Sequence, residues 1–275
     1  MQAINLPPTT CQFLVKTILK QWKPCSIFVF GYQSHSTVDD TIFNTTETST
    51  ATKHHFYIFV FANNVGIGSA ANMANTIAEA SNNTITATLL VHKTKDLTTN
   101  QPSQQWFFDQ VLRYGQRVAL DKSAPPFIVN NTTPSKDTAG DKTFWLKCEA
   151  VALFNIQAAK ESPQQEVALC KIALLHTACL QIALGLIRVN LGYTPNEFSL
   201  NYLLQLCQQF TPLPAQVFQK QTKEQQKRYK MLCAPPSMLQ HWTKLYASED
   251  DFNYLLTTTQ DFLNHSKTQI EKPNI

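Results

Sequence analysis

The sequence predicts an α+β protein in which a mixed α/β domain is followed by an all-α antiparallel helical bundle. Apolar runs rich in β-branched and aromatic residues alternate with helical patterns in the first half. From Phe144 onward the apolar residues recur at helical spacing and form no convincing strand. Pro, Asn, Thr and Gly accumulate between the halves. We therefore expect a first domain over 1–130, a linker over 131–141 and a bundle over 142–275.

Composition narrows the classes of function. The chain has 275 residues, 43% of them hydrophobic and 15% charged, which is enough to form the cores of two domains. The net charge of +4 is shared almost evenly between the halves, so neither half has the basic surplus of a dedicated nucleic-acid binder. The composition does not exclude a small, local contact with nucleic acid.

Cysteine usage and hydropathy predict the compartment. The seven cysteines are odd in number and form no Cys-x-x-Cys pair, so they indicate neither a disulfide framework nor a zinc site. No basic and apolar leader opens the sequence. The apolar stretch 167–191 contains Lys171, His176 and Arg188, which favours a buried helix over a membrane span. We expect a cytoplasmic protein with reduced cysteines and no membrane partner.

The first half divides into helices and strands. Apolar residues spaced at three and four predict a helix over 10–22, with Thr9 or Thr10 as N-cap. "CSIFVF" predicts a buried strand, and the polar stretch from about 33 to 53 predicts a long loop. "HHFYIFVFAN" predicts a central strand. A helix over 69–81, a strand over 84–94 and a helix over 103–115 that ends at Gly115 complete this half.

The second half is predicted to contain helices separated by proline-rich turns. The separators are Pro163, "GYTPNE", "TPLP" and "APPS". The expected helices lie near 142–161, 164–191, 198–210, 222–233 and 236–268.

This order of elements, together with three stretches, carries a resemblance to a known family. The stretches are "IFVFGYQSHS", "HHFYIFVF" and "LCKIALLHTACLQIALGLIRVNLGYTPNEFSLNYLLQL". They resemble bacterial proteins that join a minimal nucleotidyltransferase domain to a HEPN domain. The first two look like the family's strand-Gly-Ser loop and its Asp-x-Asp strand. The third looks like a HEPN helix with a central His, the Gly-Tyr-x-Pro turn and a Leu-rich helix.

The residues that nucleotidyl transfer requires are changed in this sequence. The reaction uses metal ions held by carboxylates at positions i and i+2 of one strand. The resemblance places His55 and Tyr57 at these positions, and no carboxylate occurs on "TITATLLV", where a third is expected. Imidazole and phenol do not supply the anionic oxygens that Mg²⁺ prefers, so we expect no metal site and no catalytic residue here. Asp39 and Asp40 are the alternative metal ligands, although adjacent carboxylates on a loop are usually solvated.

A ligand site without metal is the remaining expectation for this half. Gly31 either cradles a phosphate or makes a tight turn with positive φ. His54 and His55 are either part of the site or ordinary strand residues, one exposed and one buried. The candidate phosphate-binding or ligand-binding residues are Gly31, Tyr32, Ser34, Ser36, His55 and Tyr57.

The bundle offers a second candidate face. Many HEPN domains resemble metal-independent ribonucleases that use an Arg and a later His, but Phe198 stands where relatives have that His. His176 is expected to be a buried core histidine, because Ile172, Cys179 and Leu180 surround it at helical spacing. The family's late Tyr-x-x-x-Arg-Tyr motif loses its arginine here, and Arg228 is expected to be a solvated charge. The candidate residues of this HEPN-like face are His176, Arg188, Tyr193 and Tyr229.

Taken together, the residues predict a non-catalytic regulatory protein that binds a nucleotide, a small ligand or a protein partner and needs no cofactor. The alternative is residual nucleotidyl transfer or HEPN-type ribonuclease activity through unusual residues. The resemblance also implies a homodimer formed by the helical domain, through the helix at 164–191 and the C-terminal helix.

Overall fold

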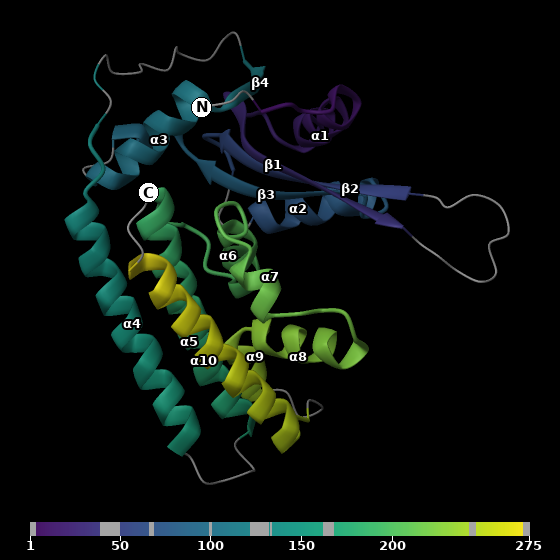
Figure 1. Cartoon of the computed structure of the whole chain (residues 1–275). Coiled ribbons are helices and arrows are strands. Elements are labelled where there is room, and N and C mark those ends of the chain that lie inside the picture. The colour runs from purple at the N-terminus through teal and green to yellow at the C-terminus, as the bar shows by residue number, and fades with distance from the viewer. Residues whose placement is uncertain are drawn as a thin grey trace, which may run out of the picture. The chain divides into compact units, whose positions relative to one another are not determined.

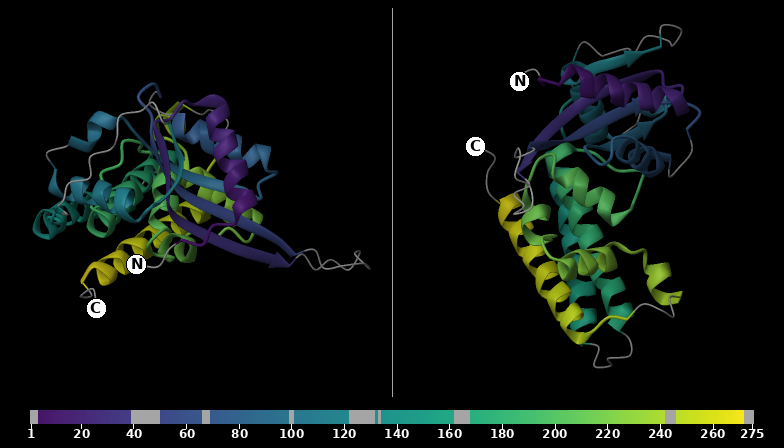
Figure 2. Two further views of the ribbon diagram at one scale, coloured as in Figure 1. Left: turned by 90° about the horizontal axis from the view of Figure 1, so that it is seen from above. Right: turned by 90° about the vertical axis from the view of Figure 1, so that its right-hand side faces the viewer.

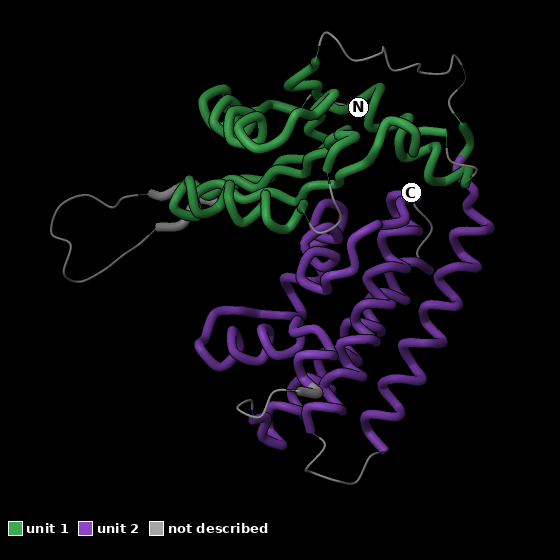
Figure 3. Tube along the Cα trace, turned by 180° about the vertical axis from the view of Figure 1, so that it is seen from behind, with its two compact units in different colours: residues 1–135 green, residues 136–275 purple. Residues whose placement is uncertain are grey.

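The computed structural model describes residues 4–38, 50–65, 69–98, 101–121, 132, 134–161, 168–241 and 246–271. The chain has the predicted α+β class and forms two compact units, 1–135 and 136–275 (Figure 3). The first unit contains a mixed four-stranded sheet with helices, and the second contains packed helices (Figure 1).

The sheet of the first unit has the strand order β3-β2-β1-β4. β1 (Ser26–Val38) pairs antiparallel with both β2 (Thr50–Phe61) and β4 (Gln116–Leu120). β2 pairs parallel with β3 (Ile85–His92), and α2 (Ser69–Ala80) connects these two strands. A parallel pair needs such a crossover, because the chain must return to the same end of the sheet. The central position predicted for β2 is confirmed.

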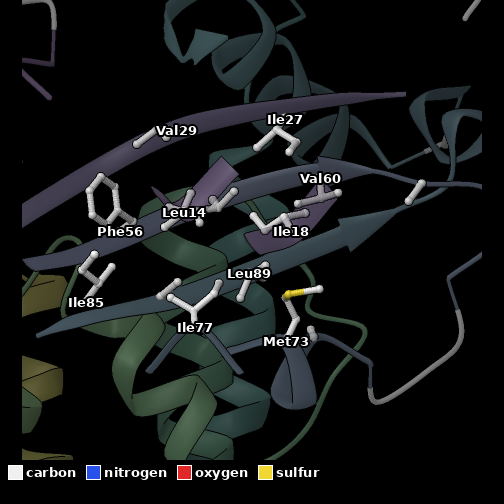
Figure 4. Packing of buried hydrophobic residues seen from close by; sticks show 14 of the residues in the cluster. Leu14, Ile18, Ile27, Val29, Phe56, Val60, Met73, Ile77, Ile85 and Leu89 are labelled. Atoms are coloured by element: carbon white, nitrogen blue, oxygen red, sulfur yellow. The ribbon is translucent and has the colours of Figure 1, made fainter. Parts of the chain in front are cut away.

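Helices cover both faces of this sheet. α1 (Pro8–Gln21) and α2 pack on one face, where Ile18 and Met73 meet aliphatic residues of the strands (Figure 4). α3 (Pro102–Tyr114) packs on the other face, where the ring centroid of Phe59 lies 5.9 Å from that of Phe107 and 5.5 Å from that of Phe108. Side chains on a strand alternate between faces, so β2 supplies aliphatic residues and Phe56 to one core and aromatic residues to the other.

β1 continues well past Gly31, so the predicted loop over 33–53 is wrong in its described part. β1 and β2 stay paired as far as Val38 of β1 and Thr50 of β2. Residues 39–49 lie outside the described residues. The polar composition misled the prediction, because main-chain pairing in a two-stranded ribbon requires no apolar rhythm. A bulge between Val29 and Gly31 marks the point where β1 changes from buried to polar sequence.

Shorter features of the first unit escaped prediction. β4 has five residues and no apolar alternation, and it gains its structure from pairing with β1. A 3₁₀ helix spans Thr94–Thr98. The N-cap of α1 is Pro7, without a side-chain cap hydrogen bond, and not Thr9 or Thr10. α3 ends at Gly115 as predicted.

The second unit contains helices and no strand among its described residues. α4 and α5 lie antiparallel, since Asp141 near the start of α4 contacts Arg188 near the end of α5. α5 is long and apolar enough to cross a membrane, but 61% of its most apolar window is buried inside the protein. The helices are α4 (Thr138–Glu161), α5 (Ala168–Leu191), α6 (Leu200–Cys207), α7 (Leu213–Val217), α8 (Lys223–Cys233), α9 (Pro236–His241) and α10 (Glu249–Glu271).

The single helix predicted over 236–268 is instead two helices, α9 and α10. Ser248 and Asp251 start α10: the Ser248 Oγ accepts from the Asp251 amide at 3.1 Å, and the Asp251 carboxylate accepts from the Ser248 amide at 3.3 Å. This reciprocal pair is a capping box, which satisfies amides that a new helix start leaves without partners. The spacing of Ser248 and Asp251 was the signal in the sequence.

Close packing of α4 on α5 predicts a stability defect in Gly185→Ala. A Cβ at Gly185 would lie 2.5 Å from Cε3 of Trp145, which is 3% exposed and has little room to move. Overpacking costs about 1–3 kcal/mol, and the better helix propensity of Ala returns about 1 kcal/mol. A contact of 2.5 Å with a buried ring places the overpacking cost in the upper part of its range, about 2–3 kcal/mol. We therefore expect a net loss of roughly 1–2 kcal/mol, measured from urea unfolding of the full chain.

The matched control is Gly185→Ala combined with Trp145→Phe, which removes the atoms nearest the new methyl group. The two changes should be coupled, with the double variant losing less than the sum of the single losses. Unchanged stability of Gly185→Ala would contradict this packing.

Candidate functional site

The predicted ligand residues of the sheet lie on two opposite faces. Gly31 pairs with Tyr57 and lies on the same face as His55. Tyr32 pairs with Phe56, so it belongs to the other face, as does Ser34. Ser36 pairs with Thr52 along the main chain, and its side chain lies outside the described residues. The five described members therefore do not form one site.

Gly31 lies inside β1 and not in a turn. Among the described residues, the glycine with positive φ is Gly192, so the alternative of a tight turn at Gly31 is wrong. The bulge instead makes Phe30 and Gly31 share one partner, Tyr57. The ring centroid of Phe30 lies 6.1 Å from that of Tyr57.

His55 forms a compact polar cluster with two threonines of β3. Its Nδ1 lies 2.7 Å from Oγ1 of Thr86, and its Nε2 lies 3.0 Å from Oγ1 of Thr88. The ring also packs edge-on against Tyr57, with centroids 4.7 Å apart. Both ring nitrogens thus have hydroxyl partners, and neither presents a lone pair to a metal ion. We call His55, Thr86 and Thr88 the His–Thr cluster.

His55 of the His–Thr cluster stands at one of the two positions where the resemblance places paired carboxylates, and Tyr57 stands at the other. Thr86 and Thr88 lie on the strand where a third carboxylate is expected. The cluster offers hydroxyl and imidazole groups in place of the anionic oxygens that a hard divalent cation prefers. Among the described residues, no three His, Cys, Asp or Glu side chains lie close enough to hold a metal ion. Asp39 and Asp40, the alternative ligands, lie outside the described residues.

His54 has a separate partner on the opposite face of the sheet. Its Nδ1 lies 2.7 Å from the Tyr32 hydroxyl, and the two rings are stacked. His54 and His55 are both half-buried, so the expectation of one exposed and one buried histidine is wrong. Cross-strand pairing with β1 covers His54, which the alternation rule alone did not reveal.

His176 is a core histidine of the bundle. It is 5% exposed, and its Nδ1 lies 2.8 Å from the main-chain carbonyl oxygen of Leu232. Burial lowers the pKa of His176, although the hydrogen bond to Leu232 opposes this shift. Cys179, one turn away, is also inert, because burial raises its pKa to about 12.

Arg188 holds the end of α5 to the start of α4. Its Nε donates to Oδ1 of Asp141 at 2.6 Å, and its Nη1 donates to Oγ1 of Thr194 at 2.8 Å. Asp141 is 1% exposed, so the pair is buried. Gly192 begins the turn with a φ of 65°, a conformation that favours glycine. Tyr193, the next residue, is fully buried.

The predicted HEPN-like residues are consequently spread along the bundle. His176 and Arg188 are separated by three turns of α5, or roughly 18 Å at the rise of an α-helix. Phe198 is 55% exposed and contributes no titratable group. These placements do not assemble a histidine and an arginine around one substrate position.

Tyr229 lines a pocket of about 520 Å³ in the second unit. Its hydroxyl donates to Oδ1 of Asn201 at 2.8 Å, and the Lys220 ammonium lies 3.6 Å from its ring centroid. Burial raises the pKa of Tyr229, so the phenol stays neutral. Burial lowers the pKa of Lys220, because desolvation disfavours the charged form. We call this cavity the Tyr229 pocket.

The Tyr229 pocket carries positive charge on a lining whose surface is mostly apolar. Among the described residues, its lining includes two lysines and two amide side chains and no acidic residue. Burial raises the pKa of the Cys233 thiol to about 11, so this cysteine is not an activated nucleophile. The lining residues are Asn201, Lys220, Gln226, Tyr229, Lys230, Cys233 and Ala234.

Arg228 is not the solvated charge that the sequence suggested. Its Nε donates to Oδ1 of Asp251 at 2.8 Å, and Lys227 donates to Oδ2 at 3.1 Å. Arg228 also lies 4.7 Å from the ring centroid of Tyr254. These contacts tie α8 to the first turn of α10. No local pattern in the sequence indicated these contacts, because their partners lie 23 and 24 residues apart along the chain.

Comparison with models of protein families gives no match, and comparison with curated proteins gives none either. The function is therefore inferred from the chemistry of the described side chains.

The contacts of Asp251 predict acid sensitivity of the second unit. Burial opposes ionisation, but hydrogen bonds from Arg228, Lys227 and Ser248 outweigh it and hold the pKa of Asp251 at about 2. An unfolded aspartate titrates near 3.9, so this stabilisation is complete above about pH 5 and is lost as the pH falls toward 2. We expect a loss of about 1–2 kcal/mol, since exposed Lys227 is screened by solvent. Urea unfolding across this pH range measures it.

Asp251→Asn should lower stability at pH 7 and remove this component of the pH dependence. Asp250→Asn is the matched control, because Asp250 lies in the same helical turn and is exposed. Equal pH profiles for the two variants would show that the ion pairs of Asp251 do not stabilise the fold.

Proposed function

We propose that the chain is a non-catalytic, two-domain protein of the nucleotidyltransferase–HEPN type that binds a phosphate-bearing small ligand in the Tyr229 pocket without metal. The sequence of elements supports the type: a helix, two antiparallel strands, a crossover helix and a parallel strand precede a helical bundle. This is the order on which the family resemblance rests.

The His–Thr cluster carries the proposal that nucleotidyl transfer is lost. Transfer needs divalent cations that neutralise the triphosphate and activate the attacking hydroxyl. At the corresponding positions His55 is bonded through both ring nitrogens, and Tyr57 is 1% exposed. A cation at this place would have to displace two hydrogen bonds to gain weak neutral ligands. Ribonuclease chemistry has no better support, because Arg188 and His176 serve internal contacts.

The charges of the Tyr229 pocket support an anionic ligand. Lys220 and Lys230 contribute two positive charges, and none of the lining residues that the structure describes is acidic. The described ion pairs of the second unit involve other side chains. The Tyr229 ring holds the Lys220 ammonium, which reduces the entropy lost when an anion is bound. Ammonium groups bind phosphate as compact point charges and need no metal bridge.

Nucleotide binding in this pocket should not require Mg²⁺ and should be sensitive to the lysines of the pocket. We expect calorimetric titration of the full chain with ATP to give an affinity in the presence of a chelator that is at least as high as with Mg²⁺, because bound Mg²⁺ neutralises part of the phosphate charge. Lys220→Met and Lys230→Met should each weaken binding by about tenfold, the effect of losing one hydrogen bond to a charged group.

Lys223→Met is the matched control, because Lys223 is an exposed lysine of α8 that does not line the pocket. Inorganic phosphate should compete with ATP. A strict requirement for Mg²⁺, or full affinity in both pocket variants, would contradict the proposal.

An exposed apolar stripe on α4 favours a homodimer of the bundle. Leu146 is 55% exposed and Phe154 is 71% exposed, and they lie eight residues apart on one face with Leu153. α5 has one exposed residue among those described, Cys170, and its apolar side is covered by the bundle. We therefore place the dimer contact on α4, and not on the helices near 164–191 and the C-terminus that the sequence suggested.

Phe154→Glu should convert the dimer to a monomer. A carboxylate in the centre of an apolar contact between helices loses its hydration, which weakens the contact. Light scattering coupled to size exclusion measures the mass of the full chain. Asn264→Glu, on the exposed polar side of α10, is the control and should remain dimeric. A monomeric wild-type chain at high concentration would exclude the dimer.

A further inference from the structure

A groove in the first unit lies between α1 and the edge strand β4. α1 runs alongside β4 (Figure 2), and the two elements enclose a space of about 640 Å³. Its apolar lining includes Val15 and Leu19 of α1 and Val118 of β4. Leu19 is 49% exposed, although it lies beside other apolar residues. The groove is distinct from the His–Thr cluster and does not depend on the function proposed above.

The charged residues of this groove all have the same sign. α1 and β4 contain no Asp or Glu, and their three cations, Lys16, Lys20 and Arg117, all line the groove. The ion pairs found among the described residues involve other side chains. Three cations around an apolar floor are complementary to a ligand that combines carboxylates with apolar side chains.

β4 also presents an open edge of the sheet. It stands at the end of the strand order and, in the part of the chain that the structure describes, pairs with β1 alone. The Asp121 amide donates to the Cys25 carbonyl at 3.0 Å. Hydrogen-bonded pairs alternate along an antiparallel ladder, so the amide and carbonyl of the preceding residue, Leu120, point to the open edge. Leu120 is 46% exposed.

We propose that this edge binds an extended acidic peptide of a partner protein. The peptide adds a strand to β4 through main-chain hydrogen bonds, and alternate side chains face the groove. Its apolar side chains pack on Val15 and Leu19, while its carboxylates reach Lys16, Lys20 and Arg117 at the rim. A bulge in the pairing of β4 with β1, between Ile27 and Phe28, twists the strand and keeps the added ladder short.

The test uses two labelled hexapeptides, one alternating glutamate with valine and the other alternating lysine with valine. Fluorescence anisotropy with the full chain should show binding of the acidic peptide that weakens with salt, and no comparable binding of the basic peptide. Equal binding of both peptides would overturn the proposal, because apolar contact alone would then explain it.

Charge reversal tests the rim of the groove. Lys20→Glu combined with Arg117→Glu should weaken the acidic peptide by more than about tenfold and create binding of the basic peptide. Lys93→Glu is the control: Lys93 is exposed and follows β3 at the opposite edge of the sheet. An equal loss in Lys93→Glu would overturn the proposal by showing that only long-range charge matters.

Leu120→Pro tests the added strand itself. Proline removes one outward amide that the pairing with β1 does not use, which edge strands tolerate. The acidic peptide should bind more weakly, while the urea midpoint of the full chain stays unchanged. Binding equal to that of the wild-type chain would exclude strand addition. If the urea midpoint falls, Leu120→Ala, which keeps the amide, should bind as the wild-type chain does; a loss of binding there would also overturn the proposal.

Discussion

The alternation of side chains along β1 and β2 is the constraint on which the first unit depends. Adjacent residues point to opposite faces, so a contiguous polar stretch in the sequence becomes two different surfaces in the sheet. Tyr32 meets His54 on one face, and His55 meets Thr86 and Thr88 on the other. The bulge at Phe30 and Gly31 sets this assignment for the outer half of β1, because one added residue exchanges the faces of all that follow. Residues that are neighbours in the sequence, and that seemed to form one site, therefore lie on opposite faces of the sheet.

Partner requirements of buried polar groups organise the second unit in a comparable way. A buried charge or ring nitrogen without a hydrogen bond costs on the order of several kcal/mol. This cost is comparable to the whole free energy of unfolding of a typical domain. Asp141 is hydrogen-bonded to Arg188, His176 to the Leu232 carbonyl oxygen, and Asp251 to Arg228. The partners lie 47, 56 and 23 residues apart along the chain, so each contact joins one helix to another helix or its end. The residues that seemed available for chemistry therefore turn out to fix helix ends and helix pairs.

The sequence predicted those elements whose signals are local. The strands at β2 and β3 and the helices at α2 and α3 follow from apolar runs and a terminal glycine. Features that depend on a distant partner were missed: β4 needs β1, and the outer half of β1 needs β2. For the same reason the burial of His176 could be predicted from the apolar residues around it on its own helix. The contact of Arg228 with Asp251 could not be predicted, because Asp251 lies on another helix. The Tyr229 pocket brings together Asn201, Lys220 and Lys230 from three segments of the chain. A local sequence pattern could not predict this pocket.

The composition of the His–Thr cluster has a thermodynamic consequence for a protein of this architecture. Carboxylates on one strand face, with a third on the neighbouring strand, repel one another unless a cation neutralises them, and such a site makes folding depend on metal. His55 with Thr86 and Thr88 contains no anion, and its groups satisfy each other's hydrogen bonds. The sheet can thus be stable without a bound ion. Under the proposed loss of nucleotidyl transfer, the absence of these anions removes a free-energy cost of keeping the sheet folded. The two binding surfaces proposed above are lined, among the described residues, by lysine and arginine and not by acids.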